Sequence, residues 1–222
     1  TDYKSTNAPC GRDLVREFVD AVRAEGLRVG LYYSLIDWHH PDFPKYNDCN
    51  HPMRGDPAYQ DEKIDFDRYL AYMHGQIEEL VTNYGRIDIL WFDYAYDELR
   101  GEAWKATELI RMVRRHQPDV IIDNRLETSG EGFGSLVSEQ PAYYSGDFVS
   151  PEQILPPEGI RNVRGERVPW ELCTTMNNNW GYTPYDTDYK PASMLIRKLV
   201  ECVSKGGNMI LNVGPDANGW FN

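Results

Sequence analysis

Apolar residues follow two spacings along this chain, one typical of helices and one typical of buried strands. Four segments carry apolar residues three and four positions apart, which predicts helices with one buried face. These helices are expected at 11–26, 61–84, 101–116 and 191–205. The short, continuous apolar runs between them are typical of parallel strands buried on both faces. Strands are expected at 29–33, 87–92, 120–122 and 209–213, with further candidates near 135–138 and 170–174.

The alternation of these elements predicts the fold class. Because helices and strands alternate without a run of hairpins, we expect parallel strands joined by right-handed crossovers. A doubly wound sheet and a (β/α)8 barrel both fit, but no Gly-x-Gly-x-x-Gly follows a strand to support a dinucleotide-binding sheet. Polar residues instead follow several strands, and in a barrel all such ends face one mouth. They are Ser34, Asp93, Asn124, Arg125, Glu171 and Asn212. We therefore predict an α/β fold of the (β/α)8 barrel type.

The barrel is expected to be incomplete. About five or six strands can be counted, against the eight of a complete barrel. The sequence therefore predicts one partial (β/α)8 domain over residues 1–222, with exposed strand edges. The first strands and the last helix are the expected missing parts, as in a fragment of a longer polypeptide.

Charge and composition narrow the class of partner. The chain has 23 basic and 35 acidic residues and a net charge of −12, which disfavours nucleic acid and anionic membrane surfaces. No run of roughly 18 apolar residues predicts a membrane span. Six Trp and 15 Tyr suit stacking on sugar C–H surfaces, although an aromatic-rich core is the simpler interpretation. The scattered cysteines show no Cys-x-x-Cys pair, so free structural thiols are expected. They are Cys10, Cys49, Cys173 and Cys202.

Asp93 is the first candidate for chemistry, because a carboxylate directly after an apolar strand is costly unless it is paired or used. From position alone it could be catalytic, a helix cap or an ion-pair partner of Arg125. Glycoside hydrolysis needs a second carboxyl group. Glu152, in a loop with apolar and proline neighbours, and Glu171, at the start of a candidate strand, cannot be separated on the sequence. Weaker candidates are Asp37, Glu139 and Asp147.

Two polar loops carry residues suited to a ligand. Residues 37–43 include two adjacent histidines and two acids, but neighbours on an extended loop point apart, so a tetrahedral metal site would need ligands from elsewhere. Contacts to sugar hydroxyls or plain loop packing are the favoured interpretations. Residues 177–182, Asn-Asn-Asn-Trp-Gly-Tyr, combine amides with rings as sugar sites do, although turns also favour Asn and Gly.

Together these segments resemble glycoside hydrolase family 29, the α-L-fucosidases. The matching stretches follow the family's order over nearly the whole chain, and the ordered set is more specific than any single match. They are 1–5, 30–35, 37–41, 89–93, 123–125, 146–153, 170–174, 180–182 and 206–215. The resemblance implies a retaining enzyme that hydrolyses terminal α-L-fucosyl linkages of oligosaccharides or glycoconjugates, without a metal or organic cofactor.

The resemblance also implies roles for individual residues. Asp93 matches the catalytic nucleophile and Glu152 the acid/base, while Glu171 matches a Trp-Glu position that we hold in reserve for the acid/base. Arg125 matches the arginine that contacts fucose near the nucleophile, and Trp180 matches the ring on the fucose methyl group. The implied substrate-binding residues are Tyr33, Trp38, Arg125, Glu171 and Trp180.

Two departures from the family pattern matter. Tyr94 stands where Gly commonly follows the nucleophile, so the entrance beyond the fucose subsite is expected to be narrower or differently shaped. The family's N-terminal strands, with the histidines that hold the fucose hydroxyls, have no counterpart in this sequence. Two alternatives therefore remain open: an inactive fucose-binding remnant, and a barrel glycosidase with another sugar specificity.

Overall fold

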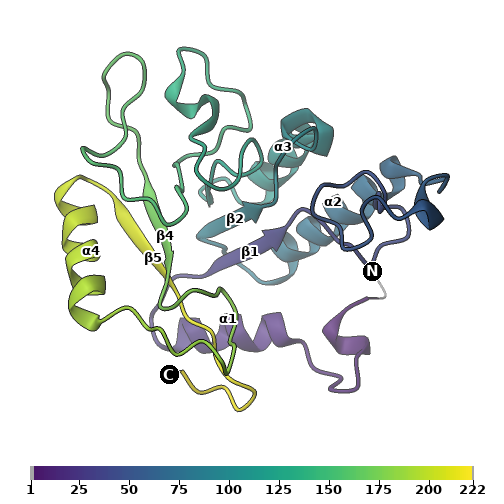
Figure 1. Cartoon of the computed structure of the whole chain (residues 1–222), viewed down its shortest axis with the longest axis horizontal. Coiled ribbons are helices and arrows are strands. Elements are labelled where there is room, and N and C mark those ends of the chain that lie inside the picture. The colour runs from purple at the N-terminus through teal and green to yellow at the C-terminus, as the bar shows by residue number, and fades with distance from the viewer. Residues whose placement is uncertain (1–2, 222) are drawn as a thin grey trace.

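Helices and strands alternate along the chain as the apolar pattern predicts. A computed structural model describes residues 3–221, so Thr1 and Asp2 of the first family-like stretch lie outside the described residues. The helices are α1 (Leu14–Ala24), α2 (Phe66–Asn83), α3 (Ala106–His116) and α4 (Ala192–Ser204) (Figure 1). The strands are β1 (Gly30–Ser34), β2 (Ile89–Asp93), β3 (Ile121–Ile122), β4 (Glu171–Thr175) and β5 (Asn208–Asn212).

All strand pairs in the two sheets are parallel. The first sheet has the order β1-β2-β3, and the second pairs β4 with β5. In the first sheet the register places Ser34 beside Asp93 at the carboxyl ends of β1 and β2. In the second, Thr175 lies beside Asn212. This confirms a mixed α/β fold with parallel sheets, and neither sheet closes on itself within residues 3–221.

An extended segment, residues 147–153, joins the two sheets. The Asp147 amide donates to the Ile122 carbonyl oxygen at 2.7 Å, and on the other side the Glu171 amide donates to the Val149 carbonyl oxygen at 2.9 Å. Its parallel bridges pair Asp123 with Phe148, Val149 with Trp170 and Glu152 with Cys173. Residues 147–153 therefore take the place of a short strand between β3 and β4.

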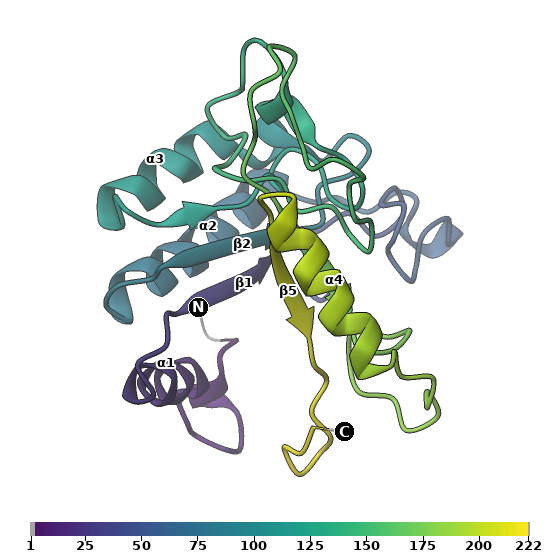
Figure 2. The ribbon, with the colours of Figure 1, turned by 90° about the vertical axis from the view of Figure 1, so that its left-hand side faces the viewer.

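Side-chain alternation along β2 decides which residues face the helices. Leu90 and Phe92 are fully buried in the main core cluster, which also holds apolar residues of α2 and α3. Trp91 belongs to a separate buried group with Phe148 and Cys173, on the opposite face. Figure 2 shows α2 and α3 together on one side of β1 and β2. Asp93, two positions after Trp91, consequently points away from the helices.

Helix α4 is covered far less than α2 and α3. Ile196 is 61% exposed and Val200 is 63% exposed, whereas Cys202 is fully buried. Figure 2 shows α4 beside β5. Within residues 3–221, β1 and β5 each pair with one strand, so each leaves one edge without a partner strand. The unpaired strand edges thus lie at β1 and β5, and exposed apolar residues lie on α4 beside β5.

Three local expectations need correction. The strand expected near 135–138 is wrong, because Gly134–Val137 form a 3-10 helix. The Glu127 carboxylate accepts bonds from the amide and hydroxyl of Ser135 and so favours a turn. The helix expected at 101–116 is split, because Lys105 has a φ of +50° between a 3-10 turn and α3. The helix expected from 61 starts at Phe66, where the Asp65 side chain caps it.

Among the described residues, no helix has the length and apolarity that crossing a membrane requires. The four cysteines are free thiols, as expected, and Cys173 and Cys202 are buried.

The turn at Gly146 yields a stability prediction. Gly146 has a φ of +82°, and an added Cβ would lie 2.1 Å from the Asp123 carbonyl oxygen. Gly165 has a similar φ of +79° but open space around it. Gly165→Ala should therefore cost only the left-handed backbone penalty of about 1–2 kcal/mol. Gly146→Ala must also displace backbone and should cost at least about 3 kcal/mol.

Urea unfolding of the two variants measures both costs on the same scale. Equal destabilisation by Gly146→Ala and Gly165→Ala would show that the backbone around Asp123 is not tightly packed against the turn.

Candidate active site

Three candidate residues converge at the carboxyl ends of the strands. Asp93 ends β2, Arg125 follows β3, and Glu152 lies on the extended segment 147–153. Arg125 Nη1 donates to Asp93 Oδ1 at 2.9 Å and to Glu152 Oε2 at 3.0 Å. Since both oxygens bond the same nitrogen, they can lie no farther apart than the sum of these distances, 5.9 Å. The sequence could not separate Glu152 from Glu171, but the structure pairs Glu152 directly with this group.

Arg125 is buried, and its contacts fix the guanidinium in place. Its side chain is 1% exposed, its Nη2 donates to the Ser150 carbonyl oxygen at 3.0 Å, and its Cζ lies 4.3 Å from the centre of the Trp91 ring. Burial lowers the pKa of the guanidinium, but the charges of Asp93 and Glu152 outweigh it and raise that pKa above its ordinary value. Arg125 is therefore a permanent cation held between two acids.

Tyr32 holds the second oxygen of Asp93. Its hydroxyl donates to Asp93 Oδ2 at 3.0 Å, and its ring stacks on Trp91 with centres 5.6 Å apart. Burial and the Asp93 charge raise the pKa of Tyr32, so the phenol remains a neutral donor. Arg125 and Tyr32 together orient both oxygens of Asp93.

The family resemblance implies a substrate-binding role for Tyr33, the neighbour of Tyr32. The Tyr33 hydroxyl donates to Gln76 Oε1 on α2 at 2.7 Å, so this side chain turns to the helix-covered face of β1. The register pairs Tyr32 with Trp91, whose side chain shares the face of Asp93. Strand alternation, once the register is known, is the signal that would have identified Tyr32.

Glu171 lies behind Trp91 and does not pair with Arg125 in the way that Glu152 does. Its Oε1 accepts from Trp91 Nε1 at 3.1 Å and from Ser150 Oγ at 3.3 Å. Burial raises its pKa, while the two donors and the Arg125 charge act against that rise. Glu171 thus binds the Trp91 indole, whose ring stacks under Arg125.

Asp123 is a fully buried acid that was not among the residues predicted for the site. Its Oδ1 accepts from the Phe92 amide at 3.1 Å, and its Oδ2 has no hydrogen-bond partner. Burial raises the pKa of Asp123 well above its ordinary value, more strongly than the nearby Arg125 lowers it. Burial therefore favours the protonated form of Asp123, and its hydrogen bond to Phe92 holds the backbone just before Asp93.

The remaining predicted residues lie on loops. Trp38 is 38% exposed and meets the His51 ring edge-on, and Trp180 is 40% exposed in the loop after β4. Two weaker acid candidates have structural partners: Asp37 accepts from the His39 amide, and Asp147 pairs with Arg114. Substrate contacts by Tyr33, Trp38 and Trp180 stay predictions.

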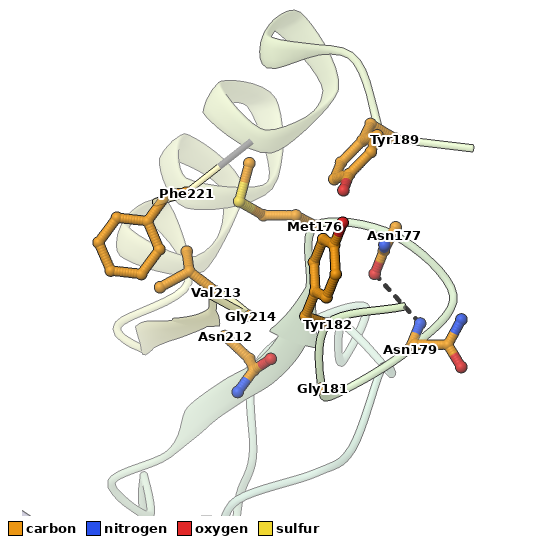
Figure 3. A pocket seen from close by; sticks show the side chains of 10 residues that line it. All are labelled: Met176, Asn177, Asn179, Gly181, Tyr182, Tyr189, Asn212, Val213, Gly214 and Phe221. Atoms are coloured by element: carbon orange, nitrogen blue, oxygen red, sulfur yellow. Dashed lines mark hydrogen bonds between the residues drawn. The ribbon is translucent and has the colours of Figure 1, made fainter. Parts of the chain in front are cut away.

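A small cavity lies between the loop after β4 and the end of β5. Figure 3 shows Met176, Tyr182 and Asn212 gathered around it. Its volume is about 10 Å³, close to the least that one water molecule needs. The buried Asn212 Oδ1 has no protein partner, which a single water could supply. This space is too small for a sugar ring.

Metal-binding side chains do not gather in the described part of the chain. No group of three or more His, Cys, Asp or Glu residues there is placed to hold a metal ion.

The chain has clear relatives in sequence and in structure. A sequence model of the family described as alpha-L-fucosidase matches residues 1–222. The plasma alpha-L-fucosidase of Rattus norvegicus is 30% identical over 212 residues, which cover 94% of this chain and 40% of that protein. The solved alpha-L-fucosidase isoenzyme 1 from Paenibacillus thiaminolyticus is 58% identical with a TM-score of 0.94, over 100% of this chain and 51% of that one. The alpha-L-fucosidase AlfC from Lactobacillus casei, solved with its α-L-fucose product, is 30% identical with a TM-score of 0.78, over 100% of this chain and 64% of that one.

The chain spans about 40% of the length of the curated relatives it matches and about half of the Paenibacillus structure.

The buried acid behind β2 gives a pH-dependent prediction. Burial holds the pKa of Asp123 above its unfolded value, so its stabilising contribution is complete below about pH 4 and is lost as pH rises through the folded pKa. Asp123→Asn keeps an acceptor for the Phe92 amide but cannot ionise. Relative to wild type, this variant should therefore gain stability as pH increases from about 5 to 8.

Urea unfolding at several pH values measures this difference, and Asp119→Asn, at an exposed position, controls for the loss of a carboxyl group. If wild type and Asp123→Asn lose or gain stability in parallel, Asp123 does not carry a raised pKa.

Proposed function

The chain belongs to the alpha-L-fucosidase family, and on that basis we propose that it carries the catalytic pair of a retaining α-L-fucosidase. Asp93 acts as the nucleophile and Glu152 as the general acid and base. The observation that carries this proposal is the shared guanidinium of Arg125, which holds both carboxylates at one strand-end site.

The separation of the two acids favours retention over inversion. Carboxyl groups of retaining glycosidases lie roughly 5–5.5 Å apart, whereas inverting enzymes need roughly 6.5–9.5 Å to admit a water molecule between acid and sugar. The upper limit of 5.9 Å between Asp93 Oδ1 and Glu152 Oε2 supports the first geometry.

In the first step, an Asp93 oxygen attacks the anomeric carbon of fucose while the bond to the leaving oxygen breaks. Glu152 gives its proton to that oxygen, so the leaving group departs as a neutral alcohol and a fucosyl ester of Asp93 remains. Arg125 and Tyr32 each bond one oxygen of Asp93 and so hold the carboxylate in place for this attack.

In the second step, Glu152 takes a proton from water, and that water attacks the anomeric carbon from the side the leaving group left. Asp93 is released as a carboxylate and fucose keeps its anomeric configuration. The Glu152 side chain is 31% exposed, so a bound sugar would remove water from it.

Glu171 is proposed to support this pair from behind. It binds the Trp91 indole, and Trp91 in turn stacks under Arg125. Burial also raises the pKa of Glu171, so Glu171 is the alternative candidate for the acid/base. Azide rescue distinguishes Glu171 from Glu152 in this role.

We further propose that residues 1–222 form part of a (β/α)8 catalytic domain. The parallel order of β1, β2 and β3, continued through 147–153 to β4 and β5, supports an arc of such a barrel. The unpaired edges of β1 and β5 and the exposed apolar side of α4 favour further strands and helices from outside this sequence.

A fucosylated oligosaccharide or glycoconjugate is the proposed substrate. AlfC structures hold the α-L-fucose product or, in one variant, 4-nitrophenyl α-L-fucopyranoside. Arg125 is the proposed charged contact, and the exposed rings of Trp38 and Trp180 are proposed to pack on the sugar.

Azide rescue of the full-length protein tests these roles. Asp93→Gly should abolish hydrolysis of an aryl fucoside, and azide should restore turnover with the inverted β-fucosyl azide as product. Glu152→Ala should lose about 100-fold or more on substrates with a poor leaving group. With an activated aryl fucoside, azide should accelerate this variant and give the retained α-fucosyl azide.

Glu171→Ala is the matched control, because it removes an acid that binds Trp91 instead of pairing with Arg125. Azide should not accelerate it. Rescue of Glu171→Ala but not of Glu152→Ala would assign the acid/base to Glu171, and undiminished activity of Asp93→Gly without azide would refute the whole mechanism.

A further inference from the structure

Tyr94, directly after the nucleophile, has a backbone conformation that tyrosine rarely adopts. Its φ is +76°, in the left-handed region that suits glycine. Such a conformation costs about 1–3 kcal/mol and persists only where the surroundings enforce it. A large aromatic residue at this point is therefore retained against a local energetic preference for glycine.

Ser129 enforces this conformation from a neighbouring loop. Its Oγ accepts from the Tyr94 amide and from the Ala95 amide, each at 2.9 Å. The Ser129 amide donates back to the Ala95 carbonyl oxygen at 3.0 Å. These three bonds fix the backbone at Tyr94 and thereby the direction in which its ring leaves the strand.

The loop that carries Ser129 also bonds to the segment 147–153, which carries the proposed acid/base Glu152. The Glu152 amide donates to the carbonyl oxygen of Gly130, the residue after Ser129, at 3.0 Å. Burial raises the pKa of Tyr94, and the charges of Asp93 and Glu152 raise it further, so the phenol lies within electrostatic range of both. Because the acid protonates the leaving oxygen, the leaving group must lie on the Glu152 side of the fucose ring.

The Tyr94 ring is braced by a neighbouring ring and stays partly exposed. Tyr96 meets it at 89°, with ring centres 5.6 Å apart. The ring is therefore held in one orientation while part of its surface remains open to a ligand.

We propose that Tyr94 is a specificity-determining residue, whose ring forms a stacking wall for the sugar to which fucose is attached. The ligand class is a pyranose leaving group, whose C–H face packs on the braced ring. This inference rests on the proposed fucosidase function and adds to it a subsite for the leaving sugar. Because the tyrosine ring is much larger than a glycine, a leaving sugar bound next to Asp93 would contact Tyr94.

Two substrates that differ only in the leaving group distinguish contact of Tyr94 with the leaving sugar from an effect of Tyr94 on the fucose site. α-L-fucosyl fluoride has a single leaving atom and cannot touch the proposed wall, whereas a fucosyl disaccharide places a pyranose against it. The measured quantity is the ratio of kcat/KM for the disaccharide to kcat/KM for the fluoride, with the best-accepted member of a disaccharide panel. The full-length protein is compared with Tyr94→Ala, Tyr94→Gly and Tyr94→Phe.

Loss of the ring in Tyr94→Ala and Tyr94→Gly should lower this ratio at least about tenfold, whereas Tyr94→Phe keeps the stacking surface and should hold it within about threefold. Tyr94→Gly should also unfold at an equal or higher urea concentration, because it relieves the positive φ. An unchanged ratio in Tyr94→Ala, or an equal loss on both substrates, would overturn the proposal. Failure of the wild-type protein to hydrolyse either substrate would instead overturn the proposed function itself.

Discussion

The buried guanidinium of Arg125 is the constraint on which the site depends. A cation with 1% exposure is costly unless opposite charges and hydrogen bonds compensate for the water it has lost. Asp93 and Glu152 supply the charge, and the Ser150 carbonyl oxygen and the Trp91 ring supply further contacts. Removing either carboxylate would leave the buried cation with one matched charge fewer. The residues proposed for chemistry therefore also stabilise the buried Arg125.

The parallel sheet brings these groups together from distant parts of the chain. Alternation along β2 sends Leu90 and Phe92 to the helices and leaves Trp91 and Asp93 on the other face. The segment 147–153 places Glu152 between the two sheets. Asp123, whose pKa burial raises, accepts a hydrogen bond from the Phe92 amide and so holds the backbone just before Asp93.

The sequence predicts the alternating elements and places Asp93 and Arg125 after apolar strands, where polar groups are costly unless they are paired or used. Glu152 and Glu171 could not be separated on the residues, and only the family resemblance favoured Glu152 as the acid/base. Contacts that depend on register or on long-range bonds require the folded chain: the register of β1 on β2 shows that Tyr32, and not Tyr33, bonds Asp93, and the fold shows that Glu152 pairs with Arg125. The prediction of a strand near 135–138 was wrong because the Glu127 side chain, eight residues earlier, binds Ser135 and stabilises a turn.

Identification of the residue that becomes covalently fucosylated tests the account most directly. A 2-fluoro-substituted fucosyl donor with a good leaving group slows the second step and traps the intermediate, and peptide mass spectrometry then locates the label. The account predicts a label on Asp93 that is released when an acceptor alcohol is added. A label on Glu152 or Glu171, or turnover of the donor by a protein in which Asp93 never becomes modified, would contradict it.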